Sequence, residues 1–174
     1  MLWACEVYPE MGCYAGSNRK RIKAFLLVLR YTGLRIRDVV TLKRSAVKDG
    51  RIFVRTQKTG VQVLVPVPPA VIEALNEVPI ISIEYLFWSG SGLPKSCVAD
   101  WQRSLRKLFK LAGVEKAHAH RFRSTMAVEL LKCGTPVDSV AAILGNTARI
   151  VEKHYSPWVQ SRQLLLEEFV KKTW

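Results

Sequence analysis

Histidine, arginine and tyrosine residues in the last third of the chain have the types and spacing that phosphodiester cleavage requires. His120 and Arg123 are three residues apart in the stretch 120–123 (His-Arg-Phe-Arg), so they would share one side of a helical turn. Tyr155 follows further along the chain. An arginine binds anions, an imidazole transfers protons near neutral pH, and a phenol is a candidate nucleophile. These residues indicate strand cleavage as candidate chemistry.

Two further cations occupy positions suited to anion binding. Arg35 begins a predicted short helix, where free backbone N–H groups and the helix dipole favour an anion, and Asp38 can hold its guanidinium in place. Lys58 lies at a predicted hairpin tip, from which its long side chain can reach a ligand. Taken alone, each has a simpler interpretation: a capped helix start with a local ion pair, and a solvent-facing turn lysine.

Simpler interpretations also exist for the other candidates. Asn146 follows Gly145 at a predicted helix end, where asparagine tolerates a left-handed cap conformation. Tyr155 precedes a serine and a proline, so it lies where regular structure breaks, but a core tyrosine with a satisfied hydroxyl fits as well. The helix that carries His120 and Arg123 could be an ordinary basic surface.

No metal centre is indicated by the histidines and cysteines. His118, His120 and His154 lack a known ligand spacing and nearby acidic partners. The cysteines contain no Cys-x-x-Cys pair, so we expect reduced thiols; they are Cys5, Cys13, Cys97 and Cys133. We therefore predict no metal site, and we also expect no cofactor.

The composition points to a polyanionic partner. The 174 residues, of which 49% are apolar, suffice for one domain with a core. A net charge of +13, from 27 basic and 14 acidic residues, favours nucleic acid as the partner. A membrane surface is less favoured, because no long basic amphipathic helix stands out. Because we find neither a secretory signal nor an apolar run long enough to span a bilayer, we expect a cytoplasmic protein.

Hydrophobic periodicity predicts a mainly α domain with a small antiparallel β-sheet, an α+β fold. Residues 1–18 are expected to be irregular, because proline and glycine interrupt any period. Residues 51–55 and 61–66 alternate apolar and polar side chains around a Lys-Thr-Gly turn, which predicts a β-hairpin. Helices are predicted at about 19–31, 35–42, from 69, 97–112, 120–133, from 136 to a stop at Gly145, and 161–172.

Taken in order, these motifs resemble the tyrosine recombinase (phage integrase) family. They are Thr-Gly-Leu-Arg at 32–35, the hairpin lysine within 57–60, His-x-x-Arg at 120–123, Leu-Gly-Asn at 144–146, and Tyr155. The resemblance covers roughly residues 19–174, which is essentially that family's catalytic domain. It implies the catalytic-domain fold, with double-stranded DNA as partner and cleavage and rejoining of DNA strands without metal or ATP.

The resemblance also implies a role for each residue. Tyr155 would attack the phosphorus and form a 3′-phosphotyrosyl link, while Lys58 would protonate the leaving 5′-oxygen. Arg35 and Arg123 would bind the scissile phosphate, and His120 would assist proton transfer. A covalent intermediate conserves the bond energy for rejoining.

Three positions refine this comparison. Asp38 matches the supporting acidic position of the family. Asn146 stands where the family usually has histidine or tryptophan, so it can donate a hydrogen bond to phosphate but cannot titrate. Ser124 stands where many members have a second histidine.

The family usually carries a separate N-terminal helical domain that closes over the other face of the DNA. Only 31 residues precede Thr32, too few for that domain. We therefore expect the core-binding domain to be absent, and the chain to be a fragment that binds DNA weakly alone. The apolar stripe Leu164, Leu165 and Phe169 is expected to dock within the chain or on a neighbouring protomer.

Alternative functions remain open at this point. Asn146 is compatible with a DNA-binding module of the same fold that no longer cleaves. A type IB topoisomerase shares the chemistry but relaxes DNA without site preference. A plain helix-turn-helix regulator explains neither Lys58 nor Tyr155. The target site, the oligomeric state and the choice between integration, excision and resolution do not follow from the sequence.

Overall fold

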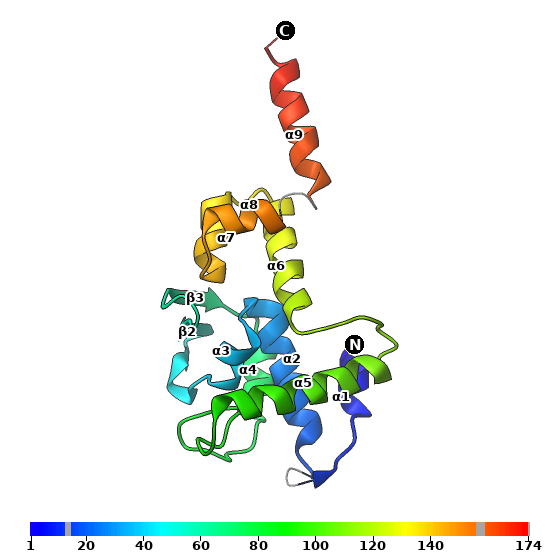
Figure 1. Ribbon diagram of the computed structural model, residues 1–174. Helices are drawn as coiled ribbons and strands as arrows, with labels where there is room; N and C mark the ends of the chain where they lie inside the picture. Colours follow the sequence, from blue (N-terminus) through cyan, green and yellow to red (C-terminus); the bar gives the residue numbers. More distant parts are fainter. Residues whose placement is uncertain (13–14, 156–158, 174) are drawn as a thin grey trace.

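Residues 2–111 form the larger part of the molecule, which we call the lower body: a set of helices packed around a small sheet (Figure 1). The helix at 120–132 connects the lower body to a smaller group of helices at 137–154. The computed structural model describes residues 1–12, 15–155 and 159–173. The elements are α1 (Leu2–Glu6), α2 (Asn18–Thr32), α3 (Ile36–Val40), the 3-10 helix η2 (Arg44–Ala46), β1 (Val47–Lys48), β2 (Arg51–Arg55), β3 (Gln62–Pro66), α4 (Pro69–Asn76), α5 (Pro94–Leu111), α6 (His120–Lys132), α7 (Val137–Leu144), α8 (Ala148–His154) and α9 (Gln160–Lys171).

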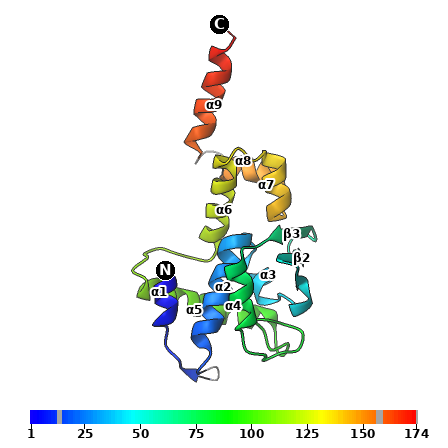
Figure 2. The same cartoon turned by 180° about the vertical axis from the view of Figure 1, so that it is seen from behind.

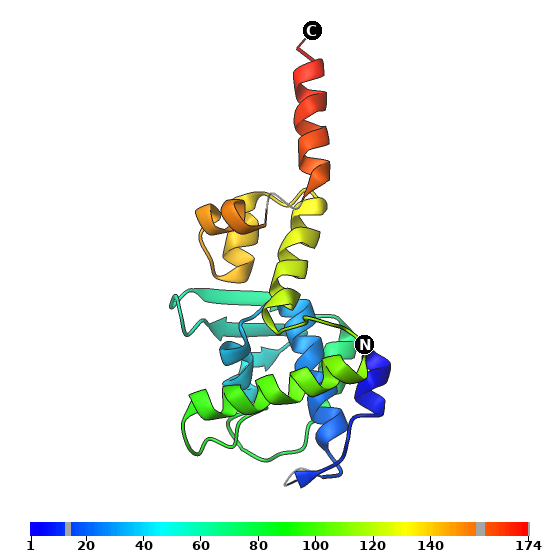
Figure 3. The same cartoon turned by 45° about the vertical axis from the view of Figure 1, so that its right-hand side comes forward.

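The sheet is antiparallel, with the strand order β1-β2-β3. In β2 and β3, Ile52 pairs with Val65 and both are buried, whereas the neighbouring pair Phe53 and Leu64 is exposed. This alternation follows from the two-residue period of a strand, which sends successive side chains to opposite faces. Figure 3 shows the hairpin of β2 and β3 lying beneath α7, and β3 is in contact with that helix.

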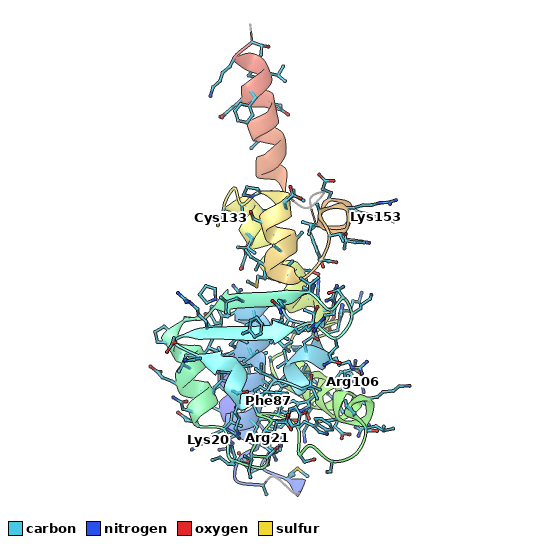
Figure 4. All side chains as sticks on the ribbon, turned by 90° about the vertical axis from the view of Figure 1, so that its left-hand side faces the viewer. Lys20, Arg21, Phe87, Arg106, Cys133 and Lys153 are labelled. Carbon is cyan, nitrogen blue, oxygen red and sulfur yellow. The ribbon has the colours of Figure 1, made fainter. Side chains whose placement is uncertain are left out.

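Helix α2 is the central element of the lower body (Figures 1 and 2). Its apolar residues recur at helical spacing, and Ile22, Phe25 and Leu29 are buried. Phe25 stacks on Trp101 of α5 with ring centroids 3.9 Å apart, and Phe87 meets Phe25 edge-on at 5.0 Å. Figure 4 shows Phe87 and Arg21 in this lower body, away from α7 and α8.

A second, smaller core joins α6, α7 and α8. It contains Ala127 and Leu131 of α6, Val140 and Leu144 of α7, and also Tyr155. Helix α9 extends away from both cores (Figure 1), and its Leu164 and Phe169 are each 61% exposed. The side chain of Leu165 lies outside the described residues.

The fold confirms the predicted mainly α architecture with a small antiparallel sheet, but the N-terminal segment differs from expectation. Residues 1–18 contain α1, whose Ala4 and Cys5 are buried against the lower body. Glu10 in the same segment accepts hydrogen bonds from the backbone amides of Asn18 (2.8 Å) and Arg19 (2.9 Å). Its carboxylate therefore occupies the start of α2, where free amides and the dipole favour an anion.

Three further local features were not predicted. Strand β1 and helix α8 are new, and α5 begins at Pro94, which occupies the favoured first-turn position for proline. Cys133 ends α6 but is exposed; Figure 4 shows it at that helix end. None of the described helices is long and apolar enough to cross a membrane.

Candidate active site

Arg123 is the centre of the candidate site and connects three of the sequence motifs. Its side chain is 1% exposed. The guanidinium donates hydrogen bonds to the carbonyl oxygens of Gly33 (Nη1, 3.0 Å) and Leu144 (Nη2, 2.7 Å). Arg123 therefore joins α6 to the C-terminal ends of α2 and α7 through charge-assisted hydrogen bonds.

Gly33 permits the close approach of these helix ends. It ends α2 in the left-handed conformation, with φ of 59°. A Cβ at this position would lie 2.8 Å from Leu144 Cδ2 and 3.0 Å from Met126 Sδ. Any larger residue would be strained and would push α2 away from α6 and α7. Glycine is therefore required here both for its backbone conformation and for its size.

Arg35 and Asp38 lie on the short turn and helix that follow. Arg35 is the N-cap residue of α3 and is half-buried, and its Nη1 is buried without a hydrogen-bond partner among the described residues. The Asp38 carboxylate is also buried: Oδ1 accepts a hydrogen bond of 2.8 Å from the Gln57 amide, whereas Oδ2 has no partner in the described part of the chain. Unsatisfied buried groups of this kind are costly in a folded protein.

The charge balance at Asp38 reflects this burial. Desolvation raises the pKa of the Asp38 carboxyl, and the Gln57 amide and the charges of Arg35 and Arg123 only partly oppose this effect. The three side chains therefore lie within electrostatic range of one another, and the acidic residue faces both candidate phosphate-binding arginines.

Tyr155 lies next to Arg123. It is 5% exposed and follows α8 as its C-cap residue, with its amide donating to the Val151 carbonyl at 2.9 Å. Burial and the charge of Arg35 lower the pKa of the Arg123 guanidinium, whereas Tyr155 raises it through its charge and a side-chain hydrogen bond. Tyr155 and the buried Arg123 therefore lie within electrostatic range of each other.

His120 is the first residue of α6 and shares the electrostatic environment of the arginines. Its side chain reaches the surface, yet partial burial lowers the pKa of the imidazole, and the charges of Arg123, His118, Arg35 and His154 lower it further. The imidazole is therefore neutral at pH 7 and can accept a proton. His120 and Arg123 share a helix face, as their spacing predicts, while Arg121 is exposed elsewhere.

Asn146 and Lys58 complete the set from two adjacent loops. Gly145, with φ of 57°, is the left-handed cap of α7, so Asn146 is not held there for that conformation. Asn146 is partly exposed, and its backbone N–H donates to the Ala141 carbonyl at 2.8 Å. Lys58 is exposed at the tip of the hairpin, and none of the described hydrogen bonds or ion pairs involves its side chain.

Two threonines of the hairpin were missed by sequence reasoning. Thr56 is 2% exposed at the end of β2, and the Thr59 hydroxyl donates to the Gly145 carbonyl at 3.2 Å. Their positions on either side of Lys58 were the only sequence signal of a role in the site. A hydroxyl in a turn usually bonds its own backbone, so a bond to distant Gly145 would not be expected. Among the described residues, no group of three or more His, Cys, Asp or Glu side chains is placed to bind a metal ion.

The fold and this site define the class of protein. The model of the phage integrase family matches residues 7–156, so the chain belongs to that family. It is 28% identical over 145 residues to a tyrosine recombinase of Thermosipho africanus (strain TCF52B), covering 82% of this chain and 51% of that protein. It is 26% identical over 137 residues to a probable integrase/recombinase of Acholeplasma phage L2, covering 76% and 47% respectively. The chain thus spans about half the length of the curated relatives it matches.

Solved structures share the fold at low identity. XerA recombinase superposes with a TM-score of 0.67 at 24% identity, covering 88% of this chain and 54% of that one. A post-cleavage complex of XerH recombinase with a palindromic difH substrate gives 0.70 at 20%, covering 97% and 49%. The catalytic core of lambda integrase gives 0.59 at 20%, covering 84% and 91%. The predicted tyrosine recombinase catalytic-domain fold is confirmed.

Proposed function

We propose that this chain is the catalytic domain of a site-specific DNA recombinase, extending over residues 19–174, which cleaves and rejoins DNA through a 3′-phosphotyrosine intermediate. The observation that carries the proposal is the packing of Tyr155 in the same core as Leu144, whose carbonyl binds the buried Arg123, with Arg35 and His120 within electrostatic range of that arginine. A nucleophile and two phosphate-binding cations are thereby gathered from motifs far apart in the sequence.

The proposed cleavage step uses these residues together with Lys58. The Tyr155 oxygen attacks the scissile phosphorus, the bond from phosphorus to the 5′-oxygen breaks, and Lys58 supplies the proton to that oxygen. Arg35 and Arg123 neutralise the charge that develops on the non-bridging oxygens, where fixed donors are most effective. The Nη1 atom of Arg35 is buried without a partner among the described residues, which supports a role for this side chain in binding a group that the chain itself does not supply.

The remaining residues orient groups and transfer protons. The neutral imidazole of His120 takes up the tyrosine proton, and Asn146 donates a hydrogen bond to a phosphate oxygen without titrating. Asp38 holds Arg35 by charge. Attack of the 5′-hydroxyl of a partner strand on the phosphotyrosine reverses the step and rejoins the DNA without ATP.

Double-stranded DNA is the proposed partner, and the protein is proposed to be a cytoplasmic, nucleoid-associated protein of prokaryotic or phage type. The net charge of +13 supports binding through phosphates. XerH recombinase is described in complex with a difH substrate, and lambda integrase as a tetramer on a Holliday junction. Affinity should fall with salt at a log–log slope of about −0.9 for each phosphate neutralised.

Self-association on DNA through the C-terminal segment is also proposed. Helix α9 projects away from both cores, and Leu164 and Phe169 are largely exposed on it. An exposed apolar pair on a helix is costly in water, and a neighbouring protomer could cover it.

The proposal is tested with suicide duplexes that carry a nick just past the scissile phosphate. Cleavage releases a short fragment with a free 5′-hydroxyl, and loss of this fragment by diffusion traps the covalent intermediate. A pool of such duplexes with randomised flanks is incubated with the chain and with Tyr155→Phe, and covalent adducts are recovered under denaturing conditions. A sequence-selective adduct that Tyr155→Phe abolishes supports a recombinase. DNA binding without any adduct supports a cleavage-deficient module, and adducts without sequence preference support a type IB topoisomerase.

A further inference from the structure

The turn that carries Lys58 is hydrogen-bonded to the rest of the site on both sides of the lysine, through Gln57 and Thr59. We propose that Thr59 is a positioning residue for Lys58, and that its hydroxyl holds the lysine turn over the scissile phosphate. This inference rests on the proposed function, because it assigns Lys58 the role of general acid. It follows from contacts of Thr59, Thr56 and Gly145 that do not involve the arginines directly.

The hydroxyls of Thr56 and Thr59 form a short relay of close contacts that ends at Gly145, the residue that caps α7. Thr56 Oγ1 lies 2.6 Å from Thr59 Oγ1, and Thr59 Oγ1 lies 3.2 Å from the Gly145 carbonyl oxygen. Each hydroxyl has one proton, and the Gly145 carbonyl can only accept. The Thr56 hydroxyl also lies 3.1 Å from the Val61 carbonyl oxygen. When Thr59 donates to Gly145, the single Thr56 proton therefore goes either to the Thr59 oxygen or to the Val61 carbonyl. Thr56 itself is buried, so this small network has little competition from water.

Gly145 lets the hairpin approach close enough for the relay to form. A Cβ on Gly145 would lie 2.9 Å from both Thr56 Cγ2 and Val63 Cγ2. The hairpin therefore packs directly on the backbone of residue 145. Because Arg123 binds the carbonyl of the preceding residue, Leu144, the relay and the buried arginine hold adjacent peptide groups.

The other side of the turn is attached to the Arg35 segment. The amide of Gln57 donates to Asp38 Oδ1 at 2.8 Å. Gln57 is thus bonded to Asp38 of α3, Thr59 is bonded to Gly145 at the end of α7, and Lys58 lies between these two attachment points. An exposed lysine otherwise samples many rotamers and loop positions, and fixing its backbone reduces the entropy lost when it reaches the leaving group.

A change of leaving group separates this role from a general effect on folding. A bridging 5′-sulfur leaves as a thiolate, since a thiol is far more acidic than an alcohol, so cleavage of the P–S bond does not need the Lys58 proton. A variant that only misplaces the general acid is therefore defective on a 5′-oxygen duplex and normal on the matched 5′-sulfur duplex.

The experiment measures single-turnover adduct formation on both duplexes, with a sequence recovered from the wild-type adduct. We expect Thr59→Val to slow the oxygen duplex about 10- to 100-fold, and the sulfur duplex less than about 3-fold. Lys58→Ala should show the same selectivity with a larger loss. Thr59→Ser keeps the hydroxyl and should restore the oxygen reaction. Thr125→Val, on an exposed α6 position, is the matched control and should leave both rates unchanged.

Each contrary result has a distinct meaning. A Thr59→Val defect of equal size on both duplexes, or no defect on the oxygen duplex, overturns the inference while leaving the proposed function intact. Failure of the wild-type chain to form an adduct with either duplex overturns the proposed function and this inference with it.

Discussion

Arg123 Nη2 donates a hydrogen bond of 2.7 Å to the carbonyl oxygen of Leu144, the residue that ends α7. The same guanidinium also donates to the Gly33 carbonyl, through Nη1 at 3.0 Å. A candidate phosphate-binding residue is therefore also a structural link between the two cores. Arg35, the other candidate arginine, is only half-buried, and its Nη1 has no hydrogen-bond partner within residues 1–12, 15–155 and 159–173. The two arginines should therefore differ when they are replaced.

Replacement of Arg123 should cost stability as well as activity. Arg123→Ala leaves two carbonyls without a charged donor and opens a space in the core, so we expect a loss of about 3 kcal/mol or more in the free energy of unfolding. Arg35→Ala is the matched control and should lose less than about 1 kcal/mol. Urea denaturation measures both, and adduct formation should be abolished in both. Equal stabilities of the two variants would refute the structural role of Arg123.

Replacement of Gly145 tests the close approach of the hairpin. Gly145→Ala combines a strained left-handed alanine, which costs about 1–3 kcal/mol, with a clash against Thr56 and Val63. Gly134→Ala is the matched control, because Gly134 has φ of 81° and no atom within 4 Å of its Cβ position. Thermal unfolding should show a larger loss for Gly145→Ala, and hydrogen exchange should show less protection in β2 and β3. Indistinguishable variants would mean that the hairpin does not rest on residue 145.

The pH dependence of stability reports on His120. Its pKa is lowered in the folded state, so the unfolded chain binds more protons below the ordinary histidine range of about 6.5. Stability should therefore be full above that range and should fall as the pH is lowered through it. His120→Gln removes this contribution. Urea midpoints at about pH 5 and about pH 8 should differ more for the wild type than for His120→Gln, and an equal difference would contradict a lowered pKa.

Asp38 should show the opposite sign. Burial raises the pKa of its carboxyl, so the ionised form at neutral pH costs folding free energy, which is recovered as the pH falls toward its ordinary range. Asp38→Asn removes the charge but keeps an oxygen that can accept from the Gln57 amide. We expect a melting temperature at pH 7 at least as high as that of the wild type, with cleavage slowed about 10-fold or more because Arg35 is no longer held by charge. A lower melting temperature would show that the charge stabilises the fold.

The strongly periodic parts of the chain were predictable, and so was the order of the motifs. Helices α2 and α6 and the hairpin lie within a residue or two of the expected positions. Helix α1 was missed because five residues cannot form a stable helix alone; it is stabilised by burial of Ala4 and Cys5. Helix α8 is also short, and its neighbours in space cannot be read from a local pattern.

The roles of individual site residues were predictable only in part. The spacing places His120 and Arg123 on one helix face, but nothing local shows that Arg123 bonds two carbonyls from distant helix ends. The contact of Thr59 with Gly145 joins residues far apart in the sequence and has no motif of its own. Such contacts depend on how the hairpin packs against α7, which is a property of the whole fold.

Identification of the residue and nucleotide end joined in the covalent intermediate tests the central claim most directly. The trapped adduct is digested with nuclease and protease, and the modified peptide is sequenced by mass spectrometry. We predict a single modified residue, Tyr155, whose oxygen carries a phosphate linked to the 3′ position of a nucleotide. A link to another residue, a link to a 5′ end, or an adduct that persists in Tyr155→Phe would contradict the assignment of Tyr155 as the nucleophile.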